Sequence, residues 1–219
     1  MLTACAWAPR ATLLEFSEQE GGGEPYATRM LVVDDYLRID DGQGSDGFIL
    51  LDRPARTIYS VSHADKTVLV IAPRKIELAP PAVFEHAVER DDEPYPQVAG
   101  KPVRRYTLTT NKQRCVEVFA ADGLLPGAVA ALREYQEILA GEQAFTAARR
   151  PKELQDDCAL AADVFVPARH LAFGFPVKQT NSTGKARDLI DFRTGVAAEP
   201  GLFELPAGYR RYSLSERLR

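Results

Sequence analysis

The sequence predicts an α+β fold in which helices pack on one antiparallel β-sheet, and three observations lead to it. In the N-terminal third, short apolar runs recur at a spacing of about 8–12 residues, too close for the crossovers that parallel strands need. After Asp122 the apolar period changes to that of a helix. Strand-like segments then resume at Gly174. Strands, then helix, then strands is the order of an α+β domain.

Six strands are predicted before residue 72. Each is an apolar or alternating run rich in β-branched and aromatic residues, and together they occupy residues 11–20, 26–33, 36–39, 48–51, 56–61 and 67–71. Glycine and aspartate fill the segments between them, as at residues 21–23 and 40–47, which is typical of turns.

The rest of the chain is predicted to hold a long connection, a hairpin, two helices and a final pair of strands. Residues 79–96 contain four prolines and are predicted as a connection; strands 103–108 and 115–119 form a hairpin around Asn111 and Lys112. Leu125, Val129, Leu132, Gln136 and Leu139 have helical spacing, so a helix runs to about Ala140, or past Gly141 to Ala148. A short helix over 153–162 and strands at 174–179 and 186–192 complete the prediction.

Length and composition predict one globular domain. The 219 residues are 45% hydrophobic and 26% charged. We expect residues 11–212 to form this domain, residues 1–10 to be a signal-peptide remnant and linker, and residues 213–219 to be a polar tail. No apolar run approaches the roughly 20 residues of a membrane span. The net charge of −4 gives no reason to expect nucleic-acid binding. We also expect the protein to be a monomer.

The three cysteines indicate a location and a disulfide. Leu2-Thr3-Ala4-Cys5 resembles a lipobox, in which the cysteine carries diacylglycerol, although only four residues precede Cys5. The alternative is an ordinary N-terminus with a small buried cysteine. If Cys5 is lipidated, Cys115 and Cys158 remain to form one disulfide; the alternative is two free thiols in a reducing compartment.

No motif predicts catalysis, a metal or a cofactor. Residues 42–47 match G-x-G-x-x-G, but a strand follows them where a dinucleotide site needs a helix. The nearby aspartates, Asp40, Asp41, Asp46 and Asp52, lack the spacing of a calcium loop. The histidines have no zinc-ligand spacing and are expected to be structural or exposed: His63, His86 and His170. We therefore expect a protein that is not an enzyme, with an envelope hydrolase as the remaining alternative.

Several segments resemble the LolA/LolB-like family of bacterial envelope proteins. Gly174-Phe-Pro-Val177, Asp191-Phe-Arg-Thr-Gly195 and Phe203-Glu-Leu-Pro-Ala-Gly-Tyr209 are similar to that fold's closing strands. Residues 36–39, 48–52 and 57–60 are similar in style to its early strands. The resemblance covers about residues 11–212 and implies a strongly curved antiparallel sheet, a half-barrel, with helices packed on its concave face.

The same resemblance implies a function for the space between sheet and helices. In the carriers of this family that space receives acyl chains, so we expect an envelope lipoprotein that binds a lipid or an acylated partner. Cys5 would tether it to the periplasmic face of the outer membrane of a Gram-negative bacterium. The alternative is a scaffolding envelope protein with a solid core and a protein partner. Alternation gives the candidate lining residues, which are Leu37, Ile39, Tyr59, Val61, Leu69, Ile71, Leu132 and Leu139.

Overall fold

The computed structural model describes residues 9–44, 46–80 and 83–217, and strands dominate this part of the chain. The strands are β1 (Arg10–Gln19), β2 (Tyr26–Val32), β3 (Tyr36–Asp40), β4 (Gly47–Asp52), β5 (Thr57–Ser62), β6 (Thr67–Ile71), β7 (His86–Arg90), β8 (Val103–Thr110), β9 (Gln113–Ala121), β10 (Phe175–Asn181), β11 (Ala186–Ala197) and β12 (Arg210–Tyr212). The helical elements are α1 (Pro126–Ala147), η1 (Lys152–Leu154), α2 (Asp157–Leu160), η2 (Ala161–Phe165), η3 (Arg169–Phe173), η4 (Pro200–Phe203) and α3 (Leu214–Arg217).

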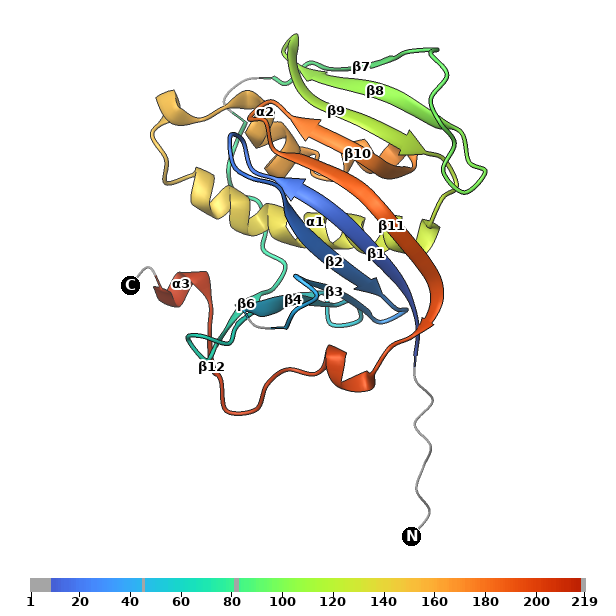
Figure 1. Cartoon of the computed structure of the whole chain (residues 1–219). Coiled ribbons are helices and arrows are strands. Elements are labelled where there is room, and N and C mark those ends of the chain that lie inside the picture. Colours follow the sequence, from blue (N-terminus) through green and yellow to red (C-terminus); the bar gives the residue numbers. More distant parts are fainter. Residues whose placement is uncertain (1–8, 45, 81–82, 218–219) are drawn as a thin grey trace.

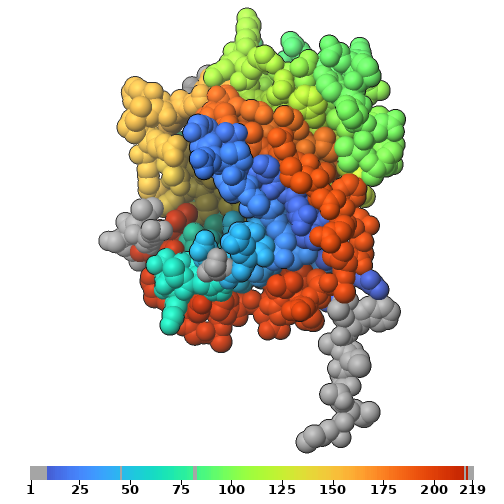
Figure 2. Space-filling view, in the orientation of Figure 1, coloured from blue at the N-terminus to red at the C-terminus, as the bar shows by residue number. Residues whose placement is uncertain are grey.

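All twelve strands belong to one sheet, in the order β12-β6-β5-β4-β3-β2-β1-β11-β10-β9-β8-β7. Neighbours pair antiparallel except β12, which lies parallel to β6 and places Arg210 opposite Thr67. The long helix α1 crosses one face of the sheet behind β1, β2 and β11 (Figure 1). Figure 2 shows the opposite face, where β1 and β2 lie beside β11 and the C-terminal segment runs along the lower edge.

The predicted fold class is wrong for this chain. The sheet is mixed rather than antiparallel, and β12 and β7 are its two free edges, so it is an open sheet and not clearly a half-barrel. One helix of 22 residues lies on it, while α2 and α3 have four residues each. The physical reason is that close strand spacing restricts only consecutive strands. It does not determine where the last strand, β12, returns to the sheet.

Hydrophobic cores lie on both faces of the sheet. The main core, beneath α1, contains Leu14, Leu37, Leu51 and Leu132. The second core, on the other face, is closed by the C-terminal segment through Ala198 and Phe203. Strand β4 serves both cores, because Leu51 points into the main core and its neighbours Phe48 and Leu50 point into the second. A strand buried on both faces reads as a continuous apolar run, as this one does.

Most predicted elements are confirmed within a few residues, including strands β1 to β6, the β8–β9 hairpin, α1, β10 and β11. Asn111 and Lys112 both adopt positive φ in the hairpin turn, at 50° and 64°. Two strands lie where the sequence predicts none: β7, inside the proline-containing connection, and β12, in the expected C-terminal approach to the tail. The predicted tail itself includes the helical turn α3, where the Ser213 amide donates to Glu216 Oε2 at 2.7 Å.

None of the helices in the described ranges is long and apolar enough to span a membrane.

Candidate functional site

A half-enclosed cavity of about 440 Å³ lies between α1, the region from η2 to η3, and the ends of strands β9 to β11. We call it the α1 cavity. Its lining residues are Tyr135, Gln136, Leu139 and Gln143 from α1; Ala162, Asp163, Pro167 and His170 from the η2–η3 region; and Val116, Gln179, Asn181, Lys185, Ala186 and Arg187 from the sheet.

Helical and strand periodicity explain why these side chains meet. On α1, Tyr135, Leu139 and Gln143 are four residues apart, and side chains with this spacing share one face of a helix. On β11, Arg187 and Leu189 are two residues apart and so lie on the same face of the sheet. Leu189 packs against the main core, whereas Arg187 lies beyond the core's edge and reaches the cavity.

The innermost polar pair of the cavity is Gln136 and His170. The amide Nε2 of Gln136 lies 3.5 Å from Nε2 of His170, which is only 8% exposed. Burial, together with the charges of Arg187 and Arg133, lowers the pKa of His170 to about 4. The imidazole is therefore neutral at neutral pH, and its Nε2 accepts a hydrogen bond from the Gln136 amide.

The other half of the Gln136 amide is unsatisfied. Its Oε1 is buried and has no hydrogen-bond partner in the described chain. Three further side chains that line the cavity also form no side-chain hydrogen bond or ion pair with another described residue: Tyr135, Gln143 and Gln179. Burial raises the pKa of Tyr135, so its hydroxyl stays protonated and can donate. Because buried polar groups in native proteins are normally paired, the buried Gln136 Oε1 indicates a place where another molecule supplies the partner, whereas Gln143 is exposed to solvent.

The cations of the cavity, by contrast, already have partners. Arg187 Nη2 lies 3.0 Å from Oε1 of Glu18, whose side chain is 6% exposed. Lys185 Nζ lies 2.6 Å from Oε1 of Glu20, and this hydrogen bond lowers the pKa of Glu20. The positive charges at the β11 side are thus balanced within the protein. Asp163 is an exposed carboxylate at the rim, with no ion-pair partner among the described residues.

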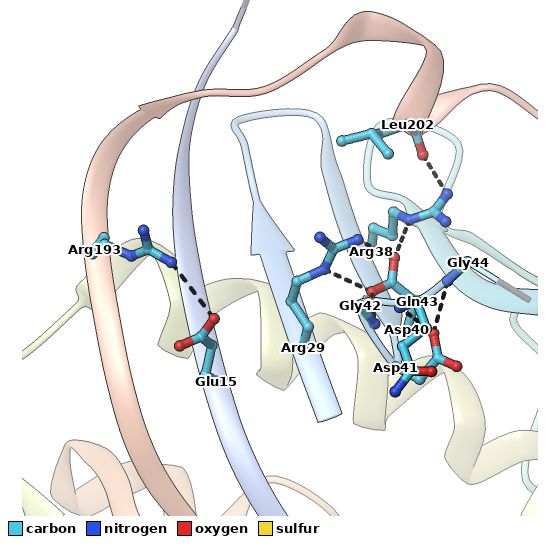
Figure 3. Close-up of polar contacts among 10 residues, drawn as sticks. All are labelled: Glu15, Arg29, Arg38, Asp40, Asp41, Gly42, Gln43, Gly44, Arg193 and Leu202. Carbon is cyan, nitrogen blue, oxygen red and sulfur yellow. Dashed lines mark hydrogen bonds and ion pairs between the residues drawn. The ribbon is translucent and has the colours of Figure 1, made fainter. Parts of the chain in front are cut away.

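A second polar cluster, around Asp40, is fully paired and serves the fold. Both nitrogens Nε and Nη2 of Arg29 donate to Asp40, at 2.7 and 2.9 Å, and Arg38 Nε donates to it at 2.6 Å (Figure 3). Arg38 also donates to the Leu202 carbonyl at 2.6 Å and lies over the Phe48 ring. Asp40 therefore joins β2 and β3 to the C-terminal segment, and its carboxylate is taken up by two arginines rather than being free to bind a cation.

The other two histidines have structural partners. His63 Nδ1 lies 3.0 Å from the Tyr209 hydroxyl, and His86 Nδ1 lies 3.0 Å from Thr110 Oγ1. They match the expected structural role, whereas His170 lines the cavity. Among the described residues, no group of three or more histidine, cysteine or carboxylate side chains could hold a metal ion.

Six of the eight residues predicted to line a pocket lie in or against the main core, and two lie on the opposite face. Leu37, Ile71 and Leu132 are buried in the main core, against which Ile39, Leu69 and Leu139 also pack. Tyr59 and Val61 belong to the second core on the opposite face. Of the eight, Leu139 alone lines the α1 cavity. Alternation identifies two sets of side chains along a strand, but it cannot say which set faces the helix when both are buried.

Two of the three cysteines form a disulfide in the structure. Cys115 on β9 and Cys158 on α2 form a disulfide, with Cα atoms 5.0 Å apart, which ties α2 to the sheet. Cys5 lies outside the described residues, so its lipidation stays a prediction.

One signal in the sequence could have identified the site. Gln136 occupies a core-facing position in the helical series that begins at Leu125, and it is the polar member of an otherwise apolar stripe. A polar residue at such a position must find a partner inside the protein. His170, Gln179 and Arg187 carry no comparable signal, because only the fold brings them to the helix.

Comparisons with known proteins add little to this description. No protein-family model matches the chain, and no curated protein matches it. Among solved structures it is similar to an uncharacterized conserved protein from Thermus thermophilus, with 7% identity and a TM-score of 0.46 over 93% of this chain and 90% of that one. It is also similar to PNGF-II in two crystal forms, with 8% identity and TM-scores of 0.44 and 0.47.

The chain spans only 31–32% of the length of PNGF-II. At these levels of similarity nothing about activity or ligands follows from either protein. Neither is described as LolA- or LolB-like, so that resemblance stays a prediction.

Proposed function

We propose that this protein is a non-enzymatic binding protein that holds one small amphiphilic molecule in the α1 cavity. The observation that carries the proposal is the buried, unpaired Gln136 Oε1 at the wall of a 440 Å³ cavity. That volume is within the range of about 300–1,000 Å³ common for small-molecule sites.

The lining suits a molecule with a hydrocarbon part and a hydrogen-bonding part. Val116, Leu139 and Pro167 offer apolar surface, against which each buried methylene contributes about 0.8 kcal/mol. Gln136, Tyr135 and Gln179 offer unpaired polar groups on other sides of the same space. This modifies the expected acyl-chain site, since a purely apolar ligand would leave those groups without partners.

Binding is favoured over hydrolysis by the identity of the lining side chains. Those that the structure describes include no serine, threonine or cysteine to act as a nucleophile, and His170 contacts an amide rather than a nucleophile or an orienting carboxylate. The proposal keeps the predicted setting, an envelope protein attached through Cys5.

The test is to fill the cavity and measure uptake of a neutral fluorescent probe. N-phenyl-1-naphthylamine should bind the purified wild-type protein at one equivalent, with a rise in fluorescence as it leaves water. Leu139→Trp should abolish this binding because the larger ring occupies the cavity. The matched control is Glu137→Trp, which adds the same ring to an exposed position on the same helix and should bind as the wild type does.

Circular dichroism verifies that each variant is folded. Ala162→Phe replaces Leu139→Trp if the latter does not fold, since Ala162 lines the cavity from its other wall. Equal binding by all variants, or none by the wild type, would contradict the proposal and favour the scaffolding alternative.

A further inference from the structure

We infer that the ligand of the α1 cavity has an uncharged, hydroxyl-bearing polar part, which donates a hydrogen bond to Gln136 Oε1. The chemical class is that of a neutral glycosyl headgroup rather than a phosphate, carboxylate or ammonium headgroup. This inference rests on the proposed function and specifies the ligand of the same site.

The first argument is that Gln136 needs a donor. Its Oε1 is an acceptor without a partner in the described chain, and its Nε2 is already directed at His170, 3.5 Å away. Phosphate, sulfate and carboxylate headgroups carry only acceptors when ionised, so they cannot satisfy Oε1. A hydroxyl can donate to Oε1 and, through its own oxygen, accept a hydrogen bond in turn; the lining residues Tyr135 and Gln179 carry such donors.

The second argument is that the two cations described at the cavity are already compensated and offer little to an anion. Arg187 is paired with the buried Glu18, and Lys185 with Glu20. An anionic headgroup would have to compete with these carboxylates. Displacing Glu18 from Arg187 would leave a charge uncompensated in a side chain that is 6% exposed, which is costly.

The third argument excludes a cation next to Gln136. His170 is neutral, and two guanidinium groups act on it: Arg187 and Arg133, which donates to the Leu171 carbonyl at 3.4 Å. Arg187 is compensated by Glu18, so the charge that opposes an ammonium group at Gln136 is that of Arg133. The one carboxylate among the described lining residues, Asp163, is exposed and lies on the η2–η3 side of the cavity rather than on α1. An uncharged hydrogen-bond donor is therefore the group least disfavoured electrostatically at this position.

The test compares three amphiphiles with the same eight-carbon chain and different headgroups. Octyl glucoside, sodium octyl sulfate and octylammonium chloride, all below their micellar concentrations, compete with N-phenyl-1-naphthylamine for the wild-type protein. We expect octyl glucoside to displace the probe with a dissociation constant at least about five times lower than either charged compound, the effect of one satisfied hydrogen bond.

A pair of variants locates the hydrogen bond. Gln136→Leu should weaken octyl glucoside about fivefold, the effect of one lost hydrogen bond, and leave binding of the probe and of octyl sulfate within about twofold. The control is Gln113→Leu, the same substitution at an exposed side chain that does not line the cavity. It should change octyl glucoside binding by less than about twofold.

The outcomes separate the two proposals. Probe binding with equal or tighter binding of octyl sulfate or octylammonium overturns the inference and leaves the binding function intact. Equal octyl glucoside affinity in the wild type and Gln136→Leu also overturns it. No probe binding by the wild type overturns the proposed function itself. Should Gln136→Leu not fold, the ranking of the three compounds on the wild type still decides.

Discussion

Asp40 and Gln136 both have a buried side-chain oxygen, but only that of Asp40 is hydrogen-bonded within the described chain. Asp40 accepts hydrogen bonds from Arg29, Arg38 and the Gly42 amide, so its lone pairs are well satisfied. Gln136 leaves its carbonyl oxygen unpaired beside a cavity, as far as the described residues go. Satisfied networks of this kind hold a fold together, whereas an unsatisfied group at a cavity needs a partner from outside the chain. Each residue therefore leads to a different prediction. For Gln136 it is that octyl glucoside binds more tightly than octyl sulfate or octylammonium.

Replacing Asp40 should be strongly destabilising. Asp40→Asn removes the charge that compensates Arg38, whose side chain is 8% exposed, and breaking such a buried pair costs about 3–5 kcal/mol. Urea unfolding at pH 7 measures the loss. The control is Glu15→Gln, which breaks the 3.5 Å pair with Arg193 between two exposed side chains (Figure 3) and should cost under about 1 kcal/mol. Equal losses in the two variants would show that the buried network is not the source of stability.

The stability difference between the wild type and Asp40→Asn should depend on pH in a predictable direction. Burial alone would raise the pKa of Asp40, but the hydrogen bonds from Arg29 and Arg38 outweigh it and hold the pKa below its ordinary value. The folded state then binds fewer protons than the unfolded state. The stability that Asp40 contributes is therefore complete above about pH 4 and is lost as pH falls through the folded-state pKa. The stability gap between wild type and Asp40→Asn should shrink below about pH 4; a gap that stays constant down through this range would contradict this.

At the scale of elements, α1 continues through Gly141, although glycine commonly marks the end of a helix. Gly141 follows the last position of the apolar series, so the sequence leaves open whether the helix ends there. The helix runs on to Ala147, and another segment passes closely over Gly141. A Cβ added at this position would lie 2.5 Å from the Arg74 carbonyl oxygen and 2.9 Å from the Arg74 Cβ. Gly141 is thus a close-packing residue, and Arg74 is further held by an ion pair with Glu142 at 3.2 Å.

This contact predicts opposite results for two glycines of one helix. Alanine is favoured over glycine inside a helix by about 1 kcal/mol. Gly127→Ala meets no atom within 4 Å and should leave the free energy of unfolding unchanged or raised by up to that amount. Gly141→Ala should instead lower it by about 1–3 kcal/mol, the usual cost of overpacking. Chemical denaturation of both variants measures the difference, and stabilisation by Gly141→Ala would disprove the close contact.

The elements that the sequence predicts correctly are those with a local signature. Alternation marks β5 and β6, and the turn at Asn111 and Lys112 marks the β8–β9 hairpin. Strand β7 has no such signature, because all five of its residues are exposed; its backbone pairs with β8, and His86 contacts Thr110 of that strand. β12 is three residues long and is held by a parallel partner far away in the sequence. Both are edge strands, whose pairing depends on tertiary position rather than on an apolar pattern.

At the scale of the whole molecule, the candidate site illustrates the same limit. The sequence predicts the helix face that carries Leu139 and the strands on the far side of the cavity. It does not predict that this helix face lies against those strands, because that depends on β11 pairing between β1 and β10, and no local pattern near Arg187 indicates this pairing. Tyr59 and Val61 lie in the second core rather than beside Leu139, because the sheet is buried on both faces and no periodicity distinguishes the second core from the first.

Because the two cores share strands β3 to β6, they should gain and lose stability together. Phe203 is 8% exposed, stacks on Tyr36 with ring centroids 5.5 Å apart, and lies in the second core. Phe203→Ala should cost about 3–5 kcal/mol. Adjacent residues of β4, Leu50 and Leu51, face different cores, so opening one face disrupts the strand that the other needs.

Hydrogen–deuterium exchange measures this coupling. In Phe203→Ala, peptides from α1, on the main core, should lose as much protection as peptides from β4, and the slowest amides of both should report one common free energy of opening. The control is Ile190→Ala, which removes an exposed apolar side chain of β11 and should leave the protection of both peptides unchanged. Faster exchange confined to residues 198–209 would mean that the C-terminal segment opens on its own and that the two cores are independent.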